Sequence, residues 1–170
     1  RPQGTISPAD FRWVEAEAPA PAEGEVLVRN LWLSCDPTQR GWIAGDTYLP
    51  AVKIGAVVRA FAVGRVVESR NPRFVKGQLV QGLFGWQDYA ISSKSEGAAG
   101  PVPPGVPVET AVSALGLTGV TAYFGLLEIG RRQPGETVVV SGAAGATGSA
   151  VGQIARIKGC RTVGLAGGAE

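Results

Sequence analysis

The sequence contains no histidine and no methionine among its 170 residues. Histidine is the commonest ligand of catalytic zinc and the general base of Ser-His-Asp and Cys-His nucleophile systems, so these classes of site are excluded within this sequence. Because methionine is absent even from position 1, we expect the sequence to begin downstream of the natural start and to be a piece of a larger protein.

Cysteine, net charge and long apolar runs are also scarce. Only Cys35 and Cys160 are present, so neither a disulfide framework nor a four-ligand structural zinc site is expected. The sequence has sixteen basic and fourteen acidic residues, and the resulting net charge of +2 is too small to indicate a nucleic-acid partner. No apolar run approaches ~18 residues and no signal peptide is visible, so we expect a cytoplasmic protein without a membrane segment.

Short strands separated by turn residues are predicted over the first hundred residues. Hydrophobic residues make up 45% of the chain, which is enough for a packed core. The strand candidates are residues 26–33, 62–68, 79–84 and 87–91. Gly64 suggests a bulge or a bend inside the second of them, and no window has a helical period. This pattern indicates a small antiparallel barrel or sandwich.

The pattern changes after a proline-rich stretch at residues 101–107, which we interpret as a rigid crossover because it lacks the polar residues of a flexible linker. Helical periodicity begins at Val108. Residues 137–141 form an unbroken run of β-branched and small residues, typical of a strand covered on both faces. A helix over 147–158 and a strand over 161–165 follow, which together predict one βαβ unit.

A glycine-rich turn joins the first of these strands to the helix. Gly145 and Gly148 occupy the second and third glycine places of the dinucleotide fingerprint, and Ala143 occupies the first. The second place lets the backbone approach a pyrophosphate, and the third lets the helix pack closely on the strand. Since the helix N-terminus favours phosphate, the context predicts dinucleotide binding; the alternative is a turn that serves packing alone.

The tip of the second strand bears on the choice between NAD and NADP. An NAD site usually places an acidic residue there, where it binds the ribose 2′-hydroxyl. Here the tip is Ala166, Gly167 and Gly168, which leave room for a 2′-phosphate and carry no charge to repel it. Glu170 lies beyond the tip and is expected to begin the next helix. We therefore predict NADP as the cofactor.

Several motifs together resemble those of one enzyme family. They occur in order over nearly the whole chain, at residues 34–41, 64–72, 85–89, 115–127 and in the glycine-rich turn. The chain resembles the zinc-independent medium-chain dehydrogenase/reductases, specifically the leukotriene B4 dehydrogenase/prostaglandin reductase group, which includes curcumin-reductase-like and alkenal double-bond reductases.

The resemblance implies an α/β fold with a β-barrel. Residues 1–113 would form the N-terminal part of a GroES-like catalytic domain, and residues 114–170 the first βαβ unit of an incomplete NADP-binding Rossmann domain. The rest of that sheet would lie outside this chain. Family members are often dimers through the edge of the Rossmann sheet, so a homodimer is also compatible with the resemblance.

The implied activity is reduction of the carbon–carbon double bond of α,β-unsaturated aldehydes and ketones by NADPH, without zinc. This reaction needs orientation and a hydrogen-bond donor near the carbonyl oxygen, where negative charge develops. Two alternatives remain open. One is an NADPH-dependent quinone oxidoreductase, and the other is a non-catalytic nucleotide-binding relative.

The resemblance also assigns candidate site residues. The cofactor-binding candidates are Thr121, Gly145, Ala146, Thr147, Gly148, Ser149, Ala166, Gly167 and Gly168. Thr121 would bind the nicotinamide carboxamide, or would bond back to its own helical turn. No catalytic residue is assigned, because the family's main tyrosine falls beyond this chain.

Three residues are candidates for the substrate pocket: Thr38, Arg40 and Tyr48. Thr38 stands where many family members carry a tyrosine that lines the pocket. Because threonine is shorter than tyrosine, its hydroxyl donor reaches less far. Arg40 could hold an anionic group or pair with Asp36. Tyr48 would line the pocket edge, or would be a packed surface aromatic.

Overall fold

The computed structural model describes residues 1–2, 4–93 and 98–168. The chain divides into two compact units, Arg1–Val108 and Glu109–Glu170. The elements of the first unit are η1 (Pro8–Asp10), β1 (Val26–Leu33), α1 (Thr38–Ala44), β2 (Ala62–Ser69), β3 (Leu79–Gly82), β4 (Tyr89–Ser92) and β5 (Gly100–Pro101). After α2 (Val108–Val112), which begins at the boundary, come α3 (Leu117–Phe124), the π-helical turn η2 (Gly125–Ile129), β6 (Thr137–Ser141), α4 (Ala146–Ile157) and β7 (Arg161–Leu165).

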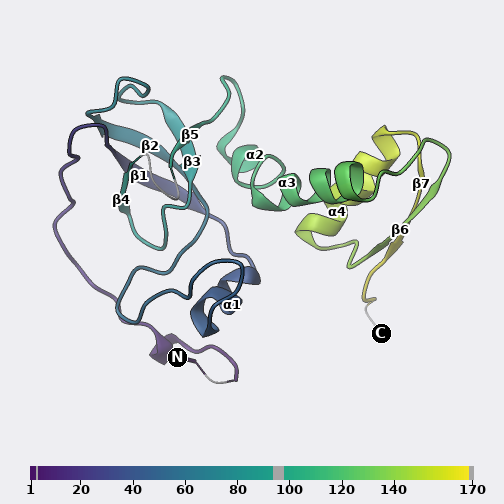
Figure 1. Ribbon diagram of the computed structural model, residues 1–170, viewed down its shortest axis with the longest axis horizontal. Helices are drawn as coiled ribbons and strands as arrows, with labels where there is room; N and C mark the ends of the chain where they lie inside the picture. The colour runs from purple at the N-terminus through teal and green to yellow at the C-terminus, as the bar shows by residue number, and fades with distance from the viewer. Residues whose placement is uncertain (3, 94–97, 169–170) are drawn as a thin grey trace. The chain divides into compact units, whose positions relative to one another are not determined.

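The first unit is built on a five-stranded antiparallel sheet in the order β4-β1-β2-β3-β5 (Figure 1). Residues at alternate positions of a strand lie on one face, and Val26 and Val28 of β1 accordingly both belong to the apolar core. The buried members of this core are Val26, Val28, Ala62, Val66, Phe74, Val80, Phe84 and Ala90. The antiparallel sheet of the predicted GroES-like domain is thus confirmed.

The predicted irregularity at Gly64 is present, but the extra residue belongs to β1. Asn30 pairs with Gly64 and Trp32 pairs with Val63, which leaves Leu31 unpaired in a bulge. A Cβ atom on Gly64 would lie 2.4 Å from Cγ1 of Val28. Glycine therefore lets β2 approach β1 at this point more closely than any side chain allows.

Helix α1 contradicts the expectation that this half of the chain has no helix. It is only seven residues long, which is too short for a periodic pattern to stand out. Tertiary contacts hold it: Trp42 is 3% exposed, and the amide of Gln39 donates to the carbonyl oxygen of Ser34 at 2.7 Å. The backbone N–H of Val52 also donates to the carbonyl oxygen of Trp42, at 2.8 Å.

The proline-rich stretch begins as part of the sheet. Its first residue, Pro101, is the last residue of β5, which pairs with β3. The N–H of Val102 then donates to the carbonyl oxygen of Leu79 at 3.0 Å. Val102 is also buried. This beginning of the predicted crossover is therefore fixed against β3.

The second unit contains the predicted βαβ arrangement. Strands β6 and β7 are parallel and in register from Thr137 opposite Arg161 to Ser141 opposite Leu165. The strand bounds match the prediction, and α4 is displaced by one residue from it. Helix α4 packs on both strands and α3 packs on α4 (Figure 1). The core comprises Leu126, Ala155 and Cys160, with Leu127, Val138, Val151 and Ile154 packed against them.

The expectation that β6 is covered on both faces is wrong for the described residues. Val140 is buried, but its neighbour Val139 is 61% exposed. The two side chains point to opposite faces of the strand, and α4 covers only one face.

Within the described ranges, no helix is both long and apolar enough to cross a membrane.

Candidate functional site: the glycine-rich turn and the Thr38–Tyr48 pair

The turn between β6 and α4 has a conformation that depends on glycine. Gly142 follows the strand with φ of +63°, in the left-handed region that side chains disfavour. The N–H of Gly145 then donates to the carbonyl oxygen of Gly142 at 2.9 Å, which closes the turn. Gly145 is the N-cap of α4, so the helix begins directly after the turn.

Gly148, in the first turn of α4, lies against the backbone of the glycine-rich turn. A Cβ atom there would be 2.3 Å from the carbonyl oxygen of Gly142 and 3.0 Å from Cα of Ala143. Both neighbours are backbone atoms and cannot rotate away. The close packing of helix on strand that the fingerprint predicts at its third glycine place is therefore present.

The turn is also attached to the second strand. The N–H of Ala143 donates to the carbonyl oxygen of Leu165, the last residue of β7, at 3.0 Å. A Cβ atom on Gly164 would lie 2.8 Å from Cβ of Ala143. The first place of the fingerprint can hold alanine here because Gly164 has no side chain.

The N-terminus of α4 can receive an anion. No side chain caps the helix, so none satisfies the free N–H groups of its first turn. Ser149 directs its hydroxyl to the carbonyl oxygen of Ala146 at 3.1 Å. Free N–H groups together with the positive end of the helix dipole suit a phosphate group. Ala146, Thr147 and Gly148 form the first turn, so the residues present fit a pyrophosphate.

The tip of β7 carries no side-chain charge. Ala166, Gly167 and Gly168 follow the strand and are exposed, and no atom lies within 4 Å of the position of a Cβ on either glycine. Up to Gly168 no acidic side chain follows β7. Glu170, expected to begin a helix, lies outside the described residues. The tip thus has room for a charged group on the ribose.

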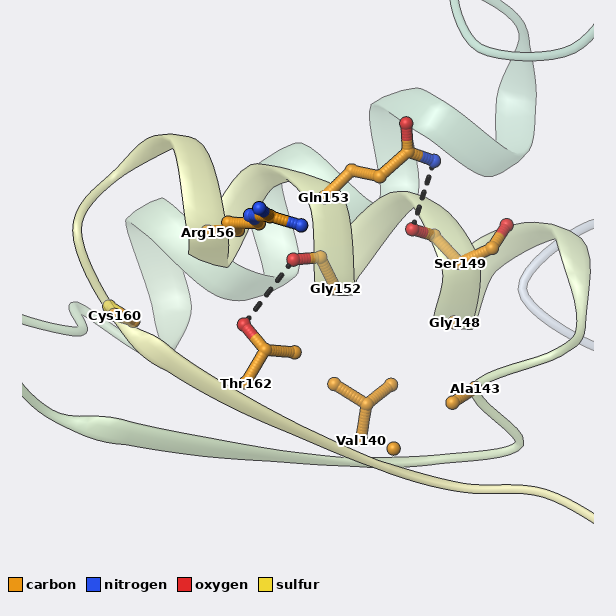
Figure 2. Close-up of a pocket in the computed structure, with 10 residues that line it drawn as sticks. Val140, Ala143, Gly148, Ser149, Gly152, Gln153, Arg156, Cys160 and Thr162 are labelled. Atoms are coloured by element: carbon orange, nitrogen blue, oxygen red, sulfur yellow. Dashed lines mark hydrogen bonds between the residues drawn. The ribbon is translucent and has the colours of Figure 1, made fainter.

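A cavity of about 530 Å³ lies between α4 and the two strands (Figure 2). Its helical wall consists of Gly148, Ser149, Gly152, Gln153 and Arg156, and Val140, Ala143, Cys160, Thr162 and Gly164 complete it. Gln153 and Arg156 are not among the site residues predicted from the sequence. Their spacing from Ser149, at four and seven residues, places all three on one helical face and could have identified them.

Thr121, in α3, donates its hydroxyl to the carbonyl oxygen of Leu117 at 2.7 Å. This is the bond within its own helical turn, which is the alternative prediction for Thr121. The bond uses the only proton of the hydroxyl, while its oxygen retains lone pairs. Thr121 can still accept a hydrogen bond from an amide N–H, such as that of a carboxamide.

The candidate substrate residues lie in the first unit, and two of them are in contact. The hydroxyl oxygens of Thr38 and Tyr48 are 3.1 Å apart. Arg40 instead donates to backbone carbonyl oxygens near the N-terminus, at 3.1 Å to Gly4 and 3.4 Å to Pro2. In the part of the chain that the structure describes, Arg40 forms no ion pair with Asp36. The described residues also contain no group of three or more acidic or cysteine side chains arranged to hold a metal ion.

A family model described as the N-terminal domain of oxidoreductase matches residues 1–99. The NADPH-dependent curcumin reductase of Escherichia coli (strain K12) is 46% identical over 171 residues, covering 100% of this chain and 49% of that protein. Prostaglandin reductase 1 of Mus musculus is 43% identical over 170 residues, covering 99% of this chain and 50% of that protein.

Solved structures give the same picture. The crystal structure of CurA from Vibrio vulnificus in complex with NADPH superposes with a TM-score of 0.86 at 41% identity. It covers 99% of this chain and 50% of the CurA chain. The chain thus spans about half the length of the curated relatives it matches.

Proposed function

Because the chain belongs to the medium-chain dehydrogenase/reductase family, in the group that includes the prostaglandin reductases, we propose that it is part of an NADPH-dependent reductase of α,β-unsaturated aldehydes and ketones. The reaction adds a hydride to the β-carbon and a proton from water to the α-carbon, which leaves a saturated carbonyl compound and NADP⁺. NADPH, when bound, supplies the hydride.

The observation that carries this proposal is the close fit of the glycine-rich turn against α4. Gly148 brings the helix N-terminus onto the backbone of Gly142, and this arrangement supports pyrophosphate binding by the first-turn N–H groups of α4. Thr147 would add a hydroxyl donor to the phosphates, and Ser149 would add a second one on releasing the carbonyl oxygen of Ala146. In α3, the oxygen of Thr121 would accept from the carboxamide and help to fix which face of the nicotinamide is presented.

We also propose that the tip of β7 selects NADPH over NADH. Replacing Ala166 with aspartate places a negative charge where the 2′-phosphate would bind, without altering a buried contact. We expect A166D to weaken NADPH binding by about tenfold or more, and NADH binding much less, because repulsion between close like charges acts only on the phosphate. Fluorescence titration with both nucleotides measures this; equal weakening of both would contradict the assignment.

The whole proposal is tested with the full-length protein. NADPH oxidation is followed by absorbance with a 2-alkenal, with a quinone, and with neither. Turnover of the alkenal in the presence of a metal chelator supports zinc-free enone reduction. Turnover of the quinone alone would favour the quinone oxidoreductase, and NADPH binding without turnover of either would favour a non-catalytic relative.

The remaining parts of the proposal concern the setting of the enzyme. We infer a cytoplasmic location, which the free thiols of Cys35 and Cys160 support, and recovery of the activity in a membrane fraction would contradict it. We also infer a homodimer that leaves nucleic acid unbound. Size-exclusion chromatography with light scattering distinguishes the dimer from a monomer.

The catalytic domain is proposed to extend to residue 113.

A further inference from the structure

In the Thr38–Tyr48 pair, the hydroxyl of the exposed Tyr48 is held in one position by the hydroxyl of Thr38. The ring of Tyr48 is on the surface, with 73% of the residue exposed, yet its hydroxyl lies 3.1 Å from Oγ1 of Thr38. Thr38 is the first residue of α1, so the hydroxyl partner is fixed to a helix. An exposed tyrosine ordinarily has no such fixed partner, and surface position alone does not explain the pair.

The ring of Tyr48 packs against a buried tryptophan ring, which itself has a cation over it. Trp42, which is 3% exposed, meets Tyr48 edge to face, with ring centroids 6.2 Å apart at 74°. The guanidinium of Arg59 lies 5.4 Å from the centroid of the Trp42 ring and donates to the carbonyl oxygen of Pro50 at 3.1 Å. The Tyr48 ring therefore rests on a buried, anchored surface.

The loop that carries Tyr48 is closed by its own hydrogen bonds. Oδ1 of Asp46 accepts from the N–H of Ala51 at 2.8 Å, and the N–H of Thr47 donates to the carbonyl oxygen of Leu49 at 3.0 Å. These bonds enclose Tyr48 from both sides. The phenol is consequently held in place before any ligand arrives.

We infer that the hydroxyl of Tyr48 donates a hydrogen bond to the carbonyl oxygen of the substrate, with no transfer of the proton, and that Thr38 is its positioning residue; this rests on the proposed reductase function. When Thr38 donates to the phenolic oxygen, the phenolic proton is left free for a third group. The two hydroxyls then form a chain in which each bond strengthens the other. A preorganised donor of this kind stabilises the negative charge that develops on a carbonyl oxygen during hydride addition.

The surroundings of the pair favour an uncharged carbonyl over a carboxylate. The guanidinium of Arg40 is engaged by the carbonyl oxygens of Pro2 and Gly4, and that of Arg59 by Trp42 and Pro50. Both cations thus already have partners other than a ligand at Tyr48. Enals and enones, whose oxygen becomes negative only during the reaction, are the class of substrate that this donor suits.

The test uses Y48F, T38V, T38S and the double variant Y48F/T38V in the full-length protein, with a 2-alkenal as substrate. We expect Y48F to lower kcat/KM by about 10–100-fold, mainly through kcat, because one oxyanion donor is lost. T38V should lower it by about three- to tenfold, since one neutral hydrogen bond is lost, and T38S should restore it. The double variant should match Y48F within about twofold, because Thr38 acts through Tyr48.

Y89F is the matched control, since Tyr89 lies in β4 and has no place in the proposed site. It should retain the wild-type kcat/KM, and all variants should keep the wild-type Tm and NADPH affinity. Wild-type kcat with Y48F, or additive effects of Y48F and T38V, would overturn this inference while leaving the proposed function intact. A wild-type protein that turns over no enal would instead overturn the proposed function.

Discussion

Replacing Gly148 by alanine is expected to weaken NADPH binding by about tenfold, which corresponds to ~1.4 kcal/mol. The added methyl group would lie 2.3 Å from the carbonyl oxygen of Gly142, so the turn and the helix N-terminus must separate. Alanine is favoured over glycine inside a helix by about 1 kcal/mol, but overpacking against fixed backbone costs about 1–3 kcal/mol. NADPH fluorescence titration measures the affinity, and thermal unfolding reports whether the unit stays folded.

Gly152, one helical turn further along α4, provides the control. A Cβ atom there would meet only Cγ2 of Thr162, at 3.6 Å, which is an ordinary contact. G152A makes the same chemical change with the same gain in helix propensity, so it should bind NADPH within about twofold of wild type and unfold at an equal or higher Tm. If G148A and G152A bind NADPH equally well, the turn is a packing feature and the dinucleotide site lies elsewhere.

Replacing Gly64 by alanine is expected to lower the free energy of unfolding by about 2–4 kcal/mol, a large fraction of the ~5–15 kcal/mol that holds a typical domain folded. Its Cβ atom would lie 2.4 Å from Cγ1 of Val28 and 2.6 Å from the carbonyl oxygen of Arg29, in the centre of the β1–β2 pairing. Because one of these neighbours is backbone, the two strands must separate. Urea unfolding followed by tryptophan fluorescence measures the change in midpoint.

Gly100 in β5 is the strand glycine with which to compare it. A Cβ atom there would come no closer than 3.9 Å, to the carbonyl oxygen of Gln81. G100A should change the unfolding free energy by no more than about 0.5 kcal/mol, as surface substitutions usually do. A midpoint for G64A that equals that of G100A would show that the sheet relaxes around the bulge and that close approach does not require glycine.

Much of the fold could be predicted from the sequence because the governing signals are local. β-branched residues bounded by turns identified β1, β6 and β7 with the bounds that the structure has. The glycine-rich turn could be assigned for the same reason. Each small residue in it avoids a steric clash with residues only a few positions away in the chain, so the sequence alone predicts that Gly148 packs against the turn.

The features that were missed depend on residues far apart in the sequence. Helix α1 is maintained by the burial of Trp42, which has no local signature in the sequence. The sequence predicts that Arg40 binds an anionic group or forms an ion pair with Asp36, but its hydrogen-bond partners are carbonyl oxygens about 36 residues away. Such backbone acceptors are present in every residue and leave no pattern in the sequence.

The candidate substrate site combines residues that the sequence predicts with a contact that it does not predict. Thr38 and Tyr48 were selected individually through their motifs, but their mutual hydrogen bond was not predicted. It depends on the chain after α1 turning back, so that Tyr48 reaches the first residue of the helix. The geometry of that return is fixed by Asp46 and by contact with Trp42. Residue identity could therefore be proposed from the sequence, whereas the coupling between the two hydroxyls required the structure.

The contact between Ala143 and Gly164 links two positions that no sequence motif treats as a pair. Since a Cβ on residue 164 would lie 2.8 Å from that of Ala143, the two positions together have space for one methyl group. A chain with alanine at 164 would need glycine at 143, and a chain with glycine at 143 could carry alanine at 164. The two sites are therefore expected to co-vary among relatives, with their combined volume conserved while each residue alone changes.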